Sequence, residues 1–506
     1  MTAQLSSETA AGSSQTFDLT HPATGAHVGT FPVHTAADVA ERLAKARVAQ
    51  VWWENQGFAG RKKLMNRWLA WIGQHADEIC DLGYEETGKT RGDVQFELIA
   101  SLEDIRWAAA HAERVLKERR VAPGVAMANY SARVGYRPLG VAGVIAPWNF
   151  PLYTPYCGMA YALAAGNAVI VKPSEFSSAT GVYAVESFYK AIPEAPEGLV
   201  SWITGFGETG AALCKSGVDK LAFTGSVPTG KRVMAACAEN LTPVLLELGG
   251  KDATIVAEDA DLDAAAEGIV WGGLFHSGQG CVCVERVYVV ASVRDDFLAR
   301  VKARVEAVTV GLEPGKDYGP MTLPAQIDIV RRHVTDALAA GATALVGGLD
   351  SIHEPYIDPI VLVDVPEDCS AVQEETFGPV IVINTVPDVE EALRRANGTS
   401  FGLGSSVFSK HRGREIAAKM RAGGTTINSV LTFVGMPSVP FGGVGDSGFG
   451  RFHGDDGLRE FTSPKATTRK KFQLGKEVST FPRPADQYKT LAGFIKFRYA
   501  KRRGVK

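Results

Sequence analysis

Cys281 and Cys283 are separated by one residue in the stretch L-F-H-S-G-Q-G-C-V-C-V-E, residues 274–285. Two such thiols can be half of a metal site, a redox pair, or one nucleophile beside an inert neighbour. The other five cysteines offer no C-x-x-C partner, so no metal is expected. The one-residue spacing also excludes a C-x-x-C redox pair. One reactive thiol and one buried unreactive thiol are the interpretations that remain.

The residues around the thiols favour a reactive loop. Gly278 and Gly280 allow close backbone approach. A helix expected over residues 261–276 and a strand expected over 286–290 place Cys281 in the loop between them, where reactive groups often lie. By residue type alone a cysteine is more often a buried hydrophobe, so the surroundings carry this interpretation.

Two further polar residues stand at the ends of apolar runs. Glu247, in L-L-E-L-G-G-K, is a carboxylate in apolar surroundings, which raises a pKa toward the range of a general base. An ion pair with Lys251 is an equally good interpretation. Asn149, in A-P-W-N-F-P-L, lies in a turn that prolines make rigid, so its amide could donate to an oxyanion. An asparagine that caps its own turn is the commoner case.

Three stretches could bind a nucleotide. V-K-P-S-E, residues 171–175, places a lysine and a carboxylate at a strand end, where such sheets bind nucleotides, or else forms a solvated ion pair. G-F-G-E-T-G, residues 205–210, fits G-x-G-x-x-G but often marks only a tight turn. F-T-G-S-V-P-T-G, residues 223–230, predicts a helix whose first amides could bind pyrophosphate or be capped in the ordinary way.

The elements expected around these residues alternate between short apolar runs and helical segments, which is typical of a doubly wound parallel sheet. The first set has strands at 141–146, 168–171, 199–203 and 220–224, and helices at 154–164, from 210, and at 228–238. A second set begins with a strand at 252–257 and continues to about residue 430. Residues 38–118 read as helical, and 130–138 as an exposed strand. The sequence therefore predicts an α/β fold with two parallel-sheet lobes.

Composition narrows the class of protein. With 53 basic and 56 acidic residues the net charge is -3, so the chain as a whole lacks the excess of basic residues that is typical of nucleic-acid-binding proteins. No run reaches the roughly 18 apolar residues of a membrane-spanning helix. Seven cysteines without a signal peptide indicate a reducing compartment, so we expect a cytoplasmic protein. Residues 1–19 read as a disordered leader. Residues 489–506 are basic and aromatic, and they suit either an amphipathic tail on a membrane surface or a solvated tail or subunit contact.

Six motifs in order, P-W-N-F, K-P-S-E, F-T-G-S, L-E-L-G-G-K, G-Q-G-C and E-E-T-F-G-P, resemble those of the aldehyde dehydrogenase superfamily over roughly residues 20–469. By position the resemblance implies that Cys281 is the nucleophile and Cys283 the bystander. It makes Glu247 the general base and Asn149 the oxyanion donor, together with the backbone N–H of Cys281. The residues it implies for cofactor binding are Pro147, Trp148, Lys172, Ser174, Glu175, Gly205, Gly225, Ser226, Leu248, Glu375 and Phe377.

The resemblance also implies the reaction and its cofactor. The thiolate adds to an aldehyde, hydride leaves to a nicotinamide, and water activated by Glu247 hydrolyses the thioester. Lys172 and Glu175 correspond to the ribose contacts, and the carboxylate of Glu175 favours NAD over NADP because it would repel a 2′-phosphate. Glu375 and Phe377 correspond to the residues that fix the nicotinamide ribose and ring.

The family implies an assembly of domains as well. We expect a cofactor domain at 20–120 and 140–248, a catalytic domain at 249–462, and an oligomerisation arm at 121–139 and 463–488. A homodimer or homotetramer follows from that arm.

The loop at residues 428–443 resembles the one that shapes the substrate mouth. It offers Leu431, Phe433, Val434, Met436 and Phe441 and no cation, so an apolar aldehyde is favoured. V-P-F-G-G-V-G-D-S-G followed by His453–Gly454 resembles the branch acting on aromatic and fatty aldehydes. The alternatives are a dehydrogenase of succinic semialdehyde or another polar aldehyde, an acyl-transferring relative, a cysteine hydrolase with His276 as base, and a catalytically silent protein of the same fold.

Overall fold

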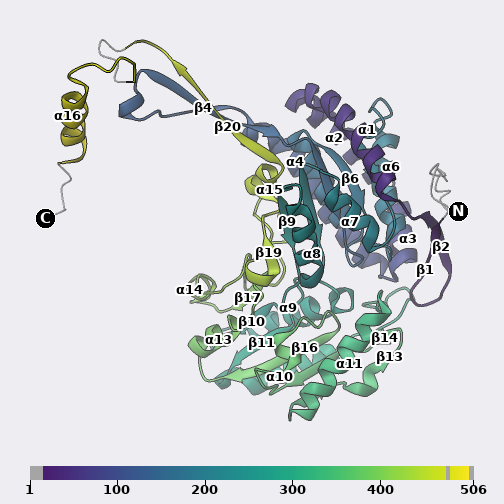
Figure 1. Ribbon diagram of the computed structural model, residues 1–506. Coiled ribbons are helices and arrows are strands. Elements are labelled where there is room, and N and C mark those ends of the chain that lie inside the picture. The colour runs from purple at the N-terminus through teal and green to yellow at the C-terminus, as the bar shows by residue number, and fades with distance from the viewer. Residues whose placement is uncertain (1–14, 474–478, 501–506) are drawn as a thin grey trace. The chain divides into compact units, whose positions relative to one another are not determined.

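The computed structural model describes residues 15–473 and 479–500 (Figure 1). The chain divides into two compact units, the first comprising Met1–Leu116 and Arg137–Ser463 and the second Lys117–Tyr136 and Pro464–Lys506. Among the described residues, none of the helices combines the length and apolar character needed to cross a membrane.

The first unit begins with a hairpin of β1 (Thr16–Thr20) and β2 (His27–Pro32). The prediction of a disordered leader over 1–19 is therefore wrong at its end, and residues 1–14 lie outside the described part. The alternation T-F-D-L-T explains the strand: Leu19 is buried, and the Phe17 ring lies 6.0 Å from Phe31 across the hairpin. Four helices follow: α1 (Ala36–Asn55), α2 (Gly57–Gln74), α3 (Ala76–Thr87) and α4 (Arg91–Leu116).

A six-stranded sheet forms the first lobe, in the order β19-β9-β8-β5-β6-β7. Its strands are β5 (Val141–Ile145), β6 (Ala168–Lys172), β7 (Val200–Trp202), β8 (Lys220–Thr224), β9 (Val244–Glu247) and the antiparallel β19 (Gly448–Phe449). Its helices are α5 (Tyr153–Ala165), α6 (Ser178–Ala191), α7 (Gly207–Lys215) and α8 (Val227–Ala238). The central strands β5 and β6 are buried throughout, as in a parallel sheet covered on both faces. Parallel pairing brings the carboxyl ends of β5, β6, β8 and β9 to one edge.

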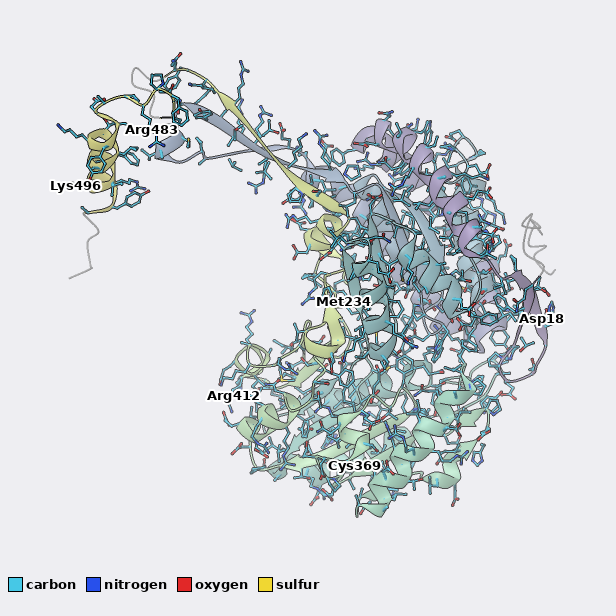
Figure 2. All side chains as sticks on the ribbon, viewed as in Figure 1. Asp18, Met234, Cys369, Arg412, Arg483 and Lys496 are labelled. Carbon is cyan, nitrogen blue, oxygen red and sulfur yellow. The ribbon has the colours of Figure 1, made fainter. Side chains whose placement is uncertain are left out.

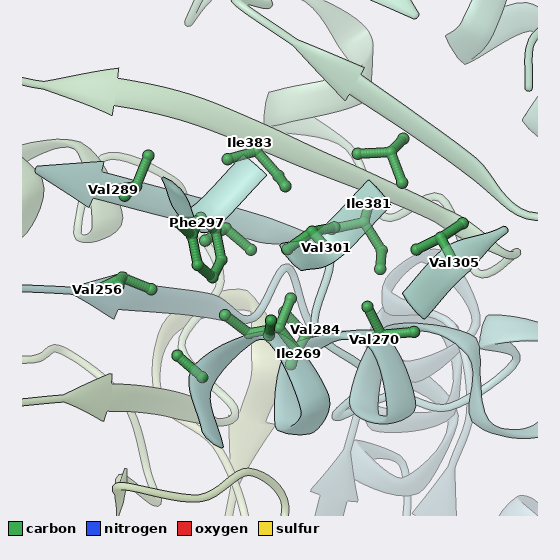
Figure 3. Close-up of a cluster of buried hydrophobic side chains, with 14 of the residues drawn as sticks. Val256, Ile269, Val270, Val284, Val289, Phe297, Val301, Val305, Ile381 and Ile383 are labelled. Carbon is green, nitrogen blue, oxygen red and sulfur yellow. The ribbon is translucent and has the colours of Figure 1, made fainter. Parts of the chain in front are cut away.

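A seven-stranded sheet forms the second lobe, in the order β12-β15-β16-β11-β10-β17-β18. Its strands are β10 (Ala253–Val256), β11 (Arg286–Val290), β12 (Thr343–Val346), β15 (Ile360–Val363), β16 (Val380–Val386), β17 (Ser405–Phe408) and β18 (Thr426–Ile427). Helices α9 (Leu262–Leu274) and α10 (Arg294–Val305) bury Ile269, Phe297 and Val301 against β10, β11 and β16 (Figure 3). Helices α11 (Pro324–Ala339) and α13 (Val389–Ala396) belong to two further buried clusters.

Shorter elements complete this unit: β13 (Ile352–His353), β14 (Tyr356–Ile357), α12 (Ser370–Gln373), α14 (Gly413–Ala417) and α15 (Gly454–Glu460). All the strands named in advance for the two sheets are present. The helix expected from residue 210 begins at Gly207. Its first turn contains glycine, which has a low helix propensity, so the earlier start had no signal in the sequence. The helix expected to reach His276 ends at Leu274, since His276 and Ser277 adopt left-handed conformations (φ 50° and 57°).

The second unit holds a three-stranded sheet in the order β20-β4-β3 and one helix. The strands are β3 (Arg119–Val121), β4 (Tyr130–Pro138) and β20 (Thr462–Lys470), and the helix is α16 (Gln487–Tyr499). Arg483 and Lys496 are exposed here (Figure 2). The predicted tail is thus helical to Tyr499, and its residues 501–506 lie outside the described part.

Candidate active site

The carboxyl ends of β5, β6, β8 and β9 border a cavity of about 1080 Å³ in the first unit. Binding at this edge is typical of open parallel sheets. The cavity lining includes these residues predicted for the site: Cys281, Glu247, Asn149, Pro147, Trp148, Lys172, Ser174, Glu175, Gly225, Ser226, Leu248, Glu375 and Phe377. The fold therefore brings the candidate nucleophile and the candidate cofactor residues into one space.

The two thiols differ in their access to this cavity. Cys281 is partly exposed and lines it, whereas Cys283 is buried, with its Sγ 3.9 Å from the carbonyl oxygen of Phe275. The loop of Cys281 lies so close to Gly250 that a Cβ on Gly250 would come 2.2 Å from the carbonyl oxygen of Cys281. Glycine at this position lets the loop after β9 lie directly against the cysteine loop.

Glu247, the last residue of β9, faces Cys281. The residue is 2% exposed and lies close enough to the Cys281 thiol for each group to shift the pKa of the other, while its Oε1 is buried without a hydrogen-bond partner among the described residues. Burial raises the pKa of Glu247 to about 8, against the lowering effect of the nearby Cys281 thiol. The predicted alternative, an ion pair with Lys251, is wrong, because Lys251 Nζ lies 2.5 Å from Glu285 Oε2. Glu247 is therefore a buried, protonatable carboxylate beside the candidate nucleophile.

The thiol of Cys281 is held in its neutral form. Burial, followed by the charge of Glu247, raises the pKa of Cys281 well above its usual value. The thiolate is the reactive form of cysteine, so attack by Cys281 requires removal of its proton. The neighbouring carboxyl of Glu247 can take that proton when it is ionised.

Asn149 lies in the turn after β5 and is 5% exposed. Its Nδ2 donates to the carbonyl oxygen of Gln279, 2.9 Å away, two residues before Cys281. The side chain of Asn149 therefore binds the cysteine loop rather than capping its own turn, which the alternative interpretation predicts. An amide nitrogen has two hydrogens, so one N–H can hold the cysteine loop and the other can face a reacting oxygen.

Gln279 is a positioning residue that sequence reasoning did not single out. Its Oε1 accepts from the backbone N–H of Thr322 at 2.9 Å, and its Nε2 donates to the carbonyl oxygen of His276 at 3.2 Å. The side chain is fully buried. Its place directly before the candidate cysteine loop was the available signal, because a buried amide there needs several partners.

Lys172 and α8 form the end of the cavity that fits a dinucleotide. Lys172 ends β6, and its Nζ donates to the carbonyl oxygen of Pro173 at 3.1 Å and lies 3.9 Å from Glu175. Helix α8 begins after Ser226 without a side-chain cap, so its first N–H groups remain available to an anion. Gly207 and Gly210 also line this end. This end therefore offers a cation, a carboxylate and a helix N-terminus, which are the groups that bind the ribose and phosphates of a dinucleotide.

Gly205 does not reach the cavity in the described part of the chain. Its φ is 136°, and a Cβ there would come 2.3 Å from Thr209 Oγ1, so it forms a tight turn against α7. That Gly205 binds the cofactor stays a prediction, whereas Gly207 and Gly210 of the same stretch line the cavity. The tight-turn interpretation of G-x-G-x-x-G holds for its first glycine.

Glu375 and Phe377 approach the cavity from the second lobe. Glu375 Oε1 accepts from the backbone N–H of Gly250 at 2.8 Å, and burial raises its pKa to about 8. The Phe377 ring lies 5.6 Å from that of Trp148, with Phe377 in a left-handed conformation (φ 52°). Glu285 supports this conformation, because its carboxylate accepts from the N–H groups of Thr376 and Phe377 at 2.8 and 3.0 Å.

His276, the base of the hydrolase alternative, does not line the cavity as the structure describes it. Its ring packs against Phe150, with centroids 5.8 Å apart. Burial, with the nearby charge of Lys89, lowers its pKa well below the usual value. A cysteine hydrolase based on His276 therefore finds no support in this geometry.

One group among the described residues has the composition of a metal site. The ligand atoms of Asp104, Cys157 and His453 lie within 4.8 Å of one another and are buried. His453 Nε2 lies 3.1 Å from Asp104 and also contacts the Tyr153 hydroxyl. These side chains form a hydrogen-bonded cluster apart from the Cys281–Cys283 pair. The sequence pattern had offered no sign of it, because its members come from three distant segments.

Comparison with known proteins bears directly on this arrangement. The sequence model of the Aldehyde dehydrogenase family matches residues 9–467. That match spans most of the chain. The chain belongs to the aldehyde dehydrogenase family.

Individual relatives match this chain over most of both sequences. The chain is similar to a 4,4′-diapolycopene aldehyde oxidase of Methylomonas sp., at 37% identity over 94% of this chain and 90% of that protein. It is also similar to a putative succinate-semialdehyde dehydrogenase [NADP(+)] of Mycolicibacterium smegmatis, at 36% identity over 88% and 87%. Among solved structures, an NAD-dependent aldehyde dehydrogenase from Sinorhizobium meliloti superposes with a TM-score of 0.87 at 33% identity, over 91% and 93%. This chain is accordingly an NAD(P)-dependent aldehyde dehydrogenase.

The other end of this dehydrogenase's cavity is apolar. Of the loop residues predicted at the mouth, Leu431, Val434 and Phe441 line it. Phe433 packs against Phe441, and Met436 is exposed and does not belong to the described lining. Aromatic residues that sequence reasoning missed contribute more of the wall: Phe96, Phe150, Tyr153, Trp271 and Phe275. Phe96 lies on α4 and Trp271 on α9, Phe275 follows α9 directly, and Phe150 and Tyr153 lie in the turn after Asn149 and at the start of α5. Apolar residues at these places read as ordinary core.

Proposed function

We propose that the protein oxidises an apolar aldehyde, aliphatic or aromatic, to its carboxylic acid, and that it prefers NAD. The observation that carries this proposal is that Cys281 and Glu247 line one cavity together, between its apolar wall and the end that offers Lys172, Glu175 and the start of α8. A nucleophile, a base and a hydride acceptor have to share one space for this reaction.

Catalysis begins when Cys281 loses its proton, which Glu247 or solvent accepts, and the thiolate adds to the aldehyde carbon. Asn149 Nδ2 and the backbone N–H of Cys281 stabilise the oxyanion of the thiohemiacetal. A nicotinamide bound in the cavity would supply the acceptor for the hydride that this carbon loses. Glu247, once it has released any proton it holds to solvent, takes a proton from water as the water oxygen adds to the thioester carbon. The carbon–sulfur bond then breaks, the acid is released, and the Cys281 thiolate takes its proton back from Glu247. Trp148 and Phe377 wall the region where the ring would lie.

The residues near Lys172 support a preference for NAD. Glu175, 3.9 Å from Lys172, can accept hydrogen bonds from two ribose hydroxyls. The same carboxylate would repel the 2′-phosphate of NADP. Arg232 also lines this end, so the preference is one of degree.

Succinic semialdehyde is the second candidate, because the M. smegmatis relative is named for it. A free carboxylate on the substrate calls for a cation near the mouth. The lysine and arginine among the described lining residues, Lys172 and Arg232, both lie at the cofactor end. The apolar wall of Phe96, Trp271 and Phe275 favours the uncharged aldehyde.

A substrate panel tests the proposal. We expect kcat/KM, measured by NADH absorbance, to rise from acetaldehyde through octanal and benzaldehyde and to exceed that for succinic semialdehyde by about 100-fold, because burying an unpaired carboxylate costs several kcal/mol. The same panel with NADP measures cofactor preference. A preference for succinic semialdehyde would overturn the apolar assignment. No reduction of NAD or NADP with any aldehyde would favour the catalytically silent alternative, and coenzyme A dependence the acyl-transferring one.

We propose further that the second unit serves assembly and surface contact. Strand β20 is exposed along Ser463–Lys470 at the edge of its sheet, and such an edge is suited to pairing with another subunit in a dimer or tetramer. On α16, Tyr488, Leu491, Ile495 and Tyr499 recur on one face and are exposed. Lys489, Lys496 and Arg498 supply positive charge beside that face. An anionic membrane surface fits both features.

Co-sedimentation with liposomes tests the membrane contact. We expect the full chain to bind phosphatidylserine-containing vesicles and to lose most of that binding when residues 487–506 are deleted. Binding should weaken in high salt because the attraction is partly electrostatic. Neutral phosphatidylcholine vesicles are the matched control. Equal binding by the truncated chain would refute the assignment.

A further inference from the structure

Lys89 and Glu97 form a buried ion pair next to the active site, and the proposed chemistry uses neither. Lys89 Nζ lies 2.7 Å from Glu97 Oε2, and both side chains are 1% exposed. Desolvating two charges costs several kcal/mol and is repaid only by good geometry and further hydrogen bonds. The further contacts of the pair therefore indicate its purpose.

The second oxygen of Glu97 caps a helix distant in sequence. Glu97 Oε1 accepts from the backbone N–H groups of Leu152 and Tyr153 at 2.7 and 2.8 Å. These are the first N–H groups of α5, which has no side-chain cap of its own. A carboxylate at a helix N-terminus is also favoured by the helix dipole. Glu97 thus holds the start of α5 from α4.

Lys89 holds the same turn from its other side. Its Nζ lies 4.4 Å from the centre of the Phe150 ring, a cation–π contact in a desolvated place. The ion pair therefore contacts Phe150 and Leu152, the residues on either side of Pro151 in the turn that follows Asn149. Asn149 is fixed in turn to the cysteine loop, since its Nδ2 donates to the Gln279 carbonyl oxygen at 2.9 Å.

We propose that Glu97, neutralised by Lys89, is a positioning residue that fixes the turn after β5 so that Asn149 can donate to the oxyanion. This inference rests on the proposed role of Asn149. An oxyanion donor acts only at hydrogen-bond distance from the developing charge, and a shift of about 1 Å can cost about 100-fold in rate. Glu97 acts on the reaction through Asn149 and contacts no reacting atom.

Paired substitutions separate the cap from the charges. Lys89→Met with Glu97→Gln removes both charges and keeps an oxygen that can accept from Leu152 and Tyr153. Lys89→Met with Glu97→Leu removes the charges and the cap together. Neither variant leaves a single unpaired charge buried. We expect the Gln variant to lose at most about threefold in kcat and the Leu variant about 30-fold, within the range for a misplaced donor.

The rate is measured in a reaction that needs neither aldehyde nor nicotinamide. In the hydrolysis of p-nitrophenyl acetate, Cys281 adds to the ester carbonyl, the bond to p-nitrophenolate breaks, and water later releases acetate. The absorbance of p-nitrophenolate reports this attack and the oxyanion it forms. Failure of aldehyde oxidation with intact esterase activity would therefore count against the proposed function and leave the role of Glu97 open to measurement.

A double-mutant cycle with Asn149→Ala provides the decisive comparison. If Glu97 acts through Asn149, the Leu variant should lower the esterase rate no further in the Asn149→Ala background. Two independent, multiplying losses would overturn the proposal. An equal loss in the Gln and Leu variants would also overturn it, because the cap would then be irrelevant. Should the Leu variant fail to fold, Glu97→Asp, which shortens the cap but keeps the charge, should give the same non-additivity.

Glu86 offers a matched control for mere loss of a helix cap. It accepts from the backbone N–H groups of Ala179 and Thr180 at 2.6 and 3.1 Å and so caps α6 rather than α5. Glu86→Leu should lower the thermal unfolding midpoint and leave the esterase rate unchanged. A loss of esterase rate equal to that of the Glu97 variant would reduce the effect of Glu97 to general stability.

Discussion

Replacing Cys281 by serine should abolish aldehyde oxidation, lowering kcat by at least about 10,000-fold, the scale seen when a covalent nucleophile is removed. A serine hydroxyl loses its proton far less readily than a thiol, and a single carboxylate with a pKa of about 8 cannot ionise it. Production of NADH from an apolar aldehyde is the measurement.

Cys283→Ser is the control for this prediction. Cys283 is buried and contacts the Phe275 carbonyl oxygen rather than the cavity, so its replacement should change kcat by less than about threefold while lowering stability modestly. Thiol-specific labelling followed by mass spectrometry should modify Cys281 first, and substrate should protect it. Activity surviving in Cys281→Ser but not in Cys283→Ser would identify the other thiol as the nucleophile.

Replacing Glu247 by glutamine should stall the reaction after hydride transfer, if acylation proceeds with another proton acceptor such as solvent. The first turnover should then appear as a burst of NADH, followed by a steady rate about 100- to 10,000-fold below the wild type, the usual contribution of a general base. Mass spectrometry of the quenched protein should find the acyl group on Cys281. Loss of the burst as well would mean that Glu247 is also needed to deprotonate Cys281.

The pH profile gives an independent view of the same residue. Burial raises the pKa of Glu247 to about 8, so the carboxyl is protonated at lower pH and becomes a base as pH rises through that value. Steady turnover in the wild type should therefore increase with pH and level off above about 8. The slow turnover of Glu247→Gln should lack this rise. A rise of the same shape in that variant would assign the titration to another group, such as Glu375, whose pKa is also about 8.

Strands β5 and β6 show where local sequence patterns are sufficient to predict the position of site residues. The strand runs V-A-G-V-I and A-V-I-V-K are apolar enough to be buried on both faces, so their place at the centre of a parallel sheet follows from composition. Parallel pairing then sends the residues after each run to one edge. Lys172 and Glu247 end their strands, and Asn149 lies in the turn after β5, so their convergence could be predicted from order along the chain.

Pairings between distant segments could not be predicted in this way. Lys251 was as good a partner for Glu247 as for Glu285 until the fold placed its Nζ 2.5 Å from Glu285. Gly205 had the spacing of a phosphate-binding glycine but forms a turn against Thr209. Glu97 reads as one acidic residue on a long helix, yet it caps α5 more than fifty positions onward. Such contacts depend on how lobes and helices pack, which spacing does not encode.

The sequence by itself determined which chemical groups were available and that parallel strands would carry them to a common edge, because strand burial and turn chemistry are local properties. Only the tertiary structure decided which thiol meets the cavity and what holds Asn149. Those outcomes depend on a backbone approach at Gly250 and on a buried ion pair between α4 and its neighbours, and both arise from contacts between segments far apart in the chain.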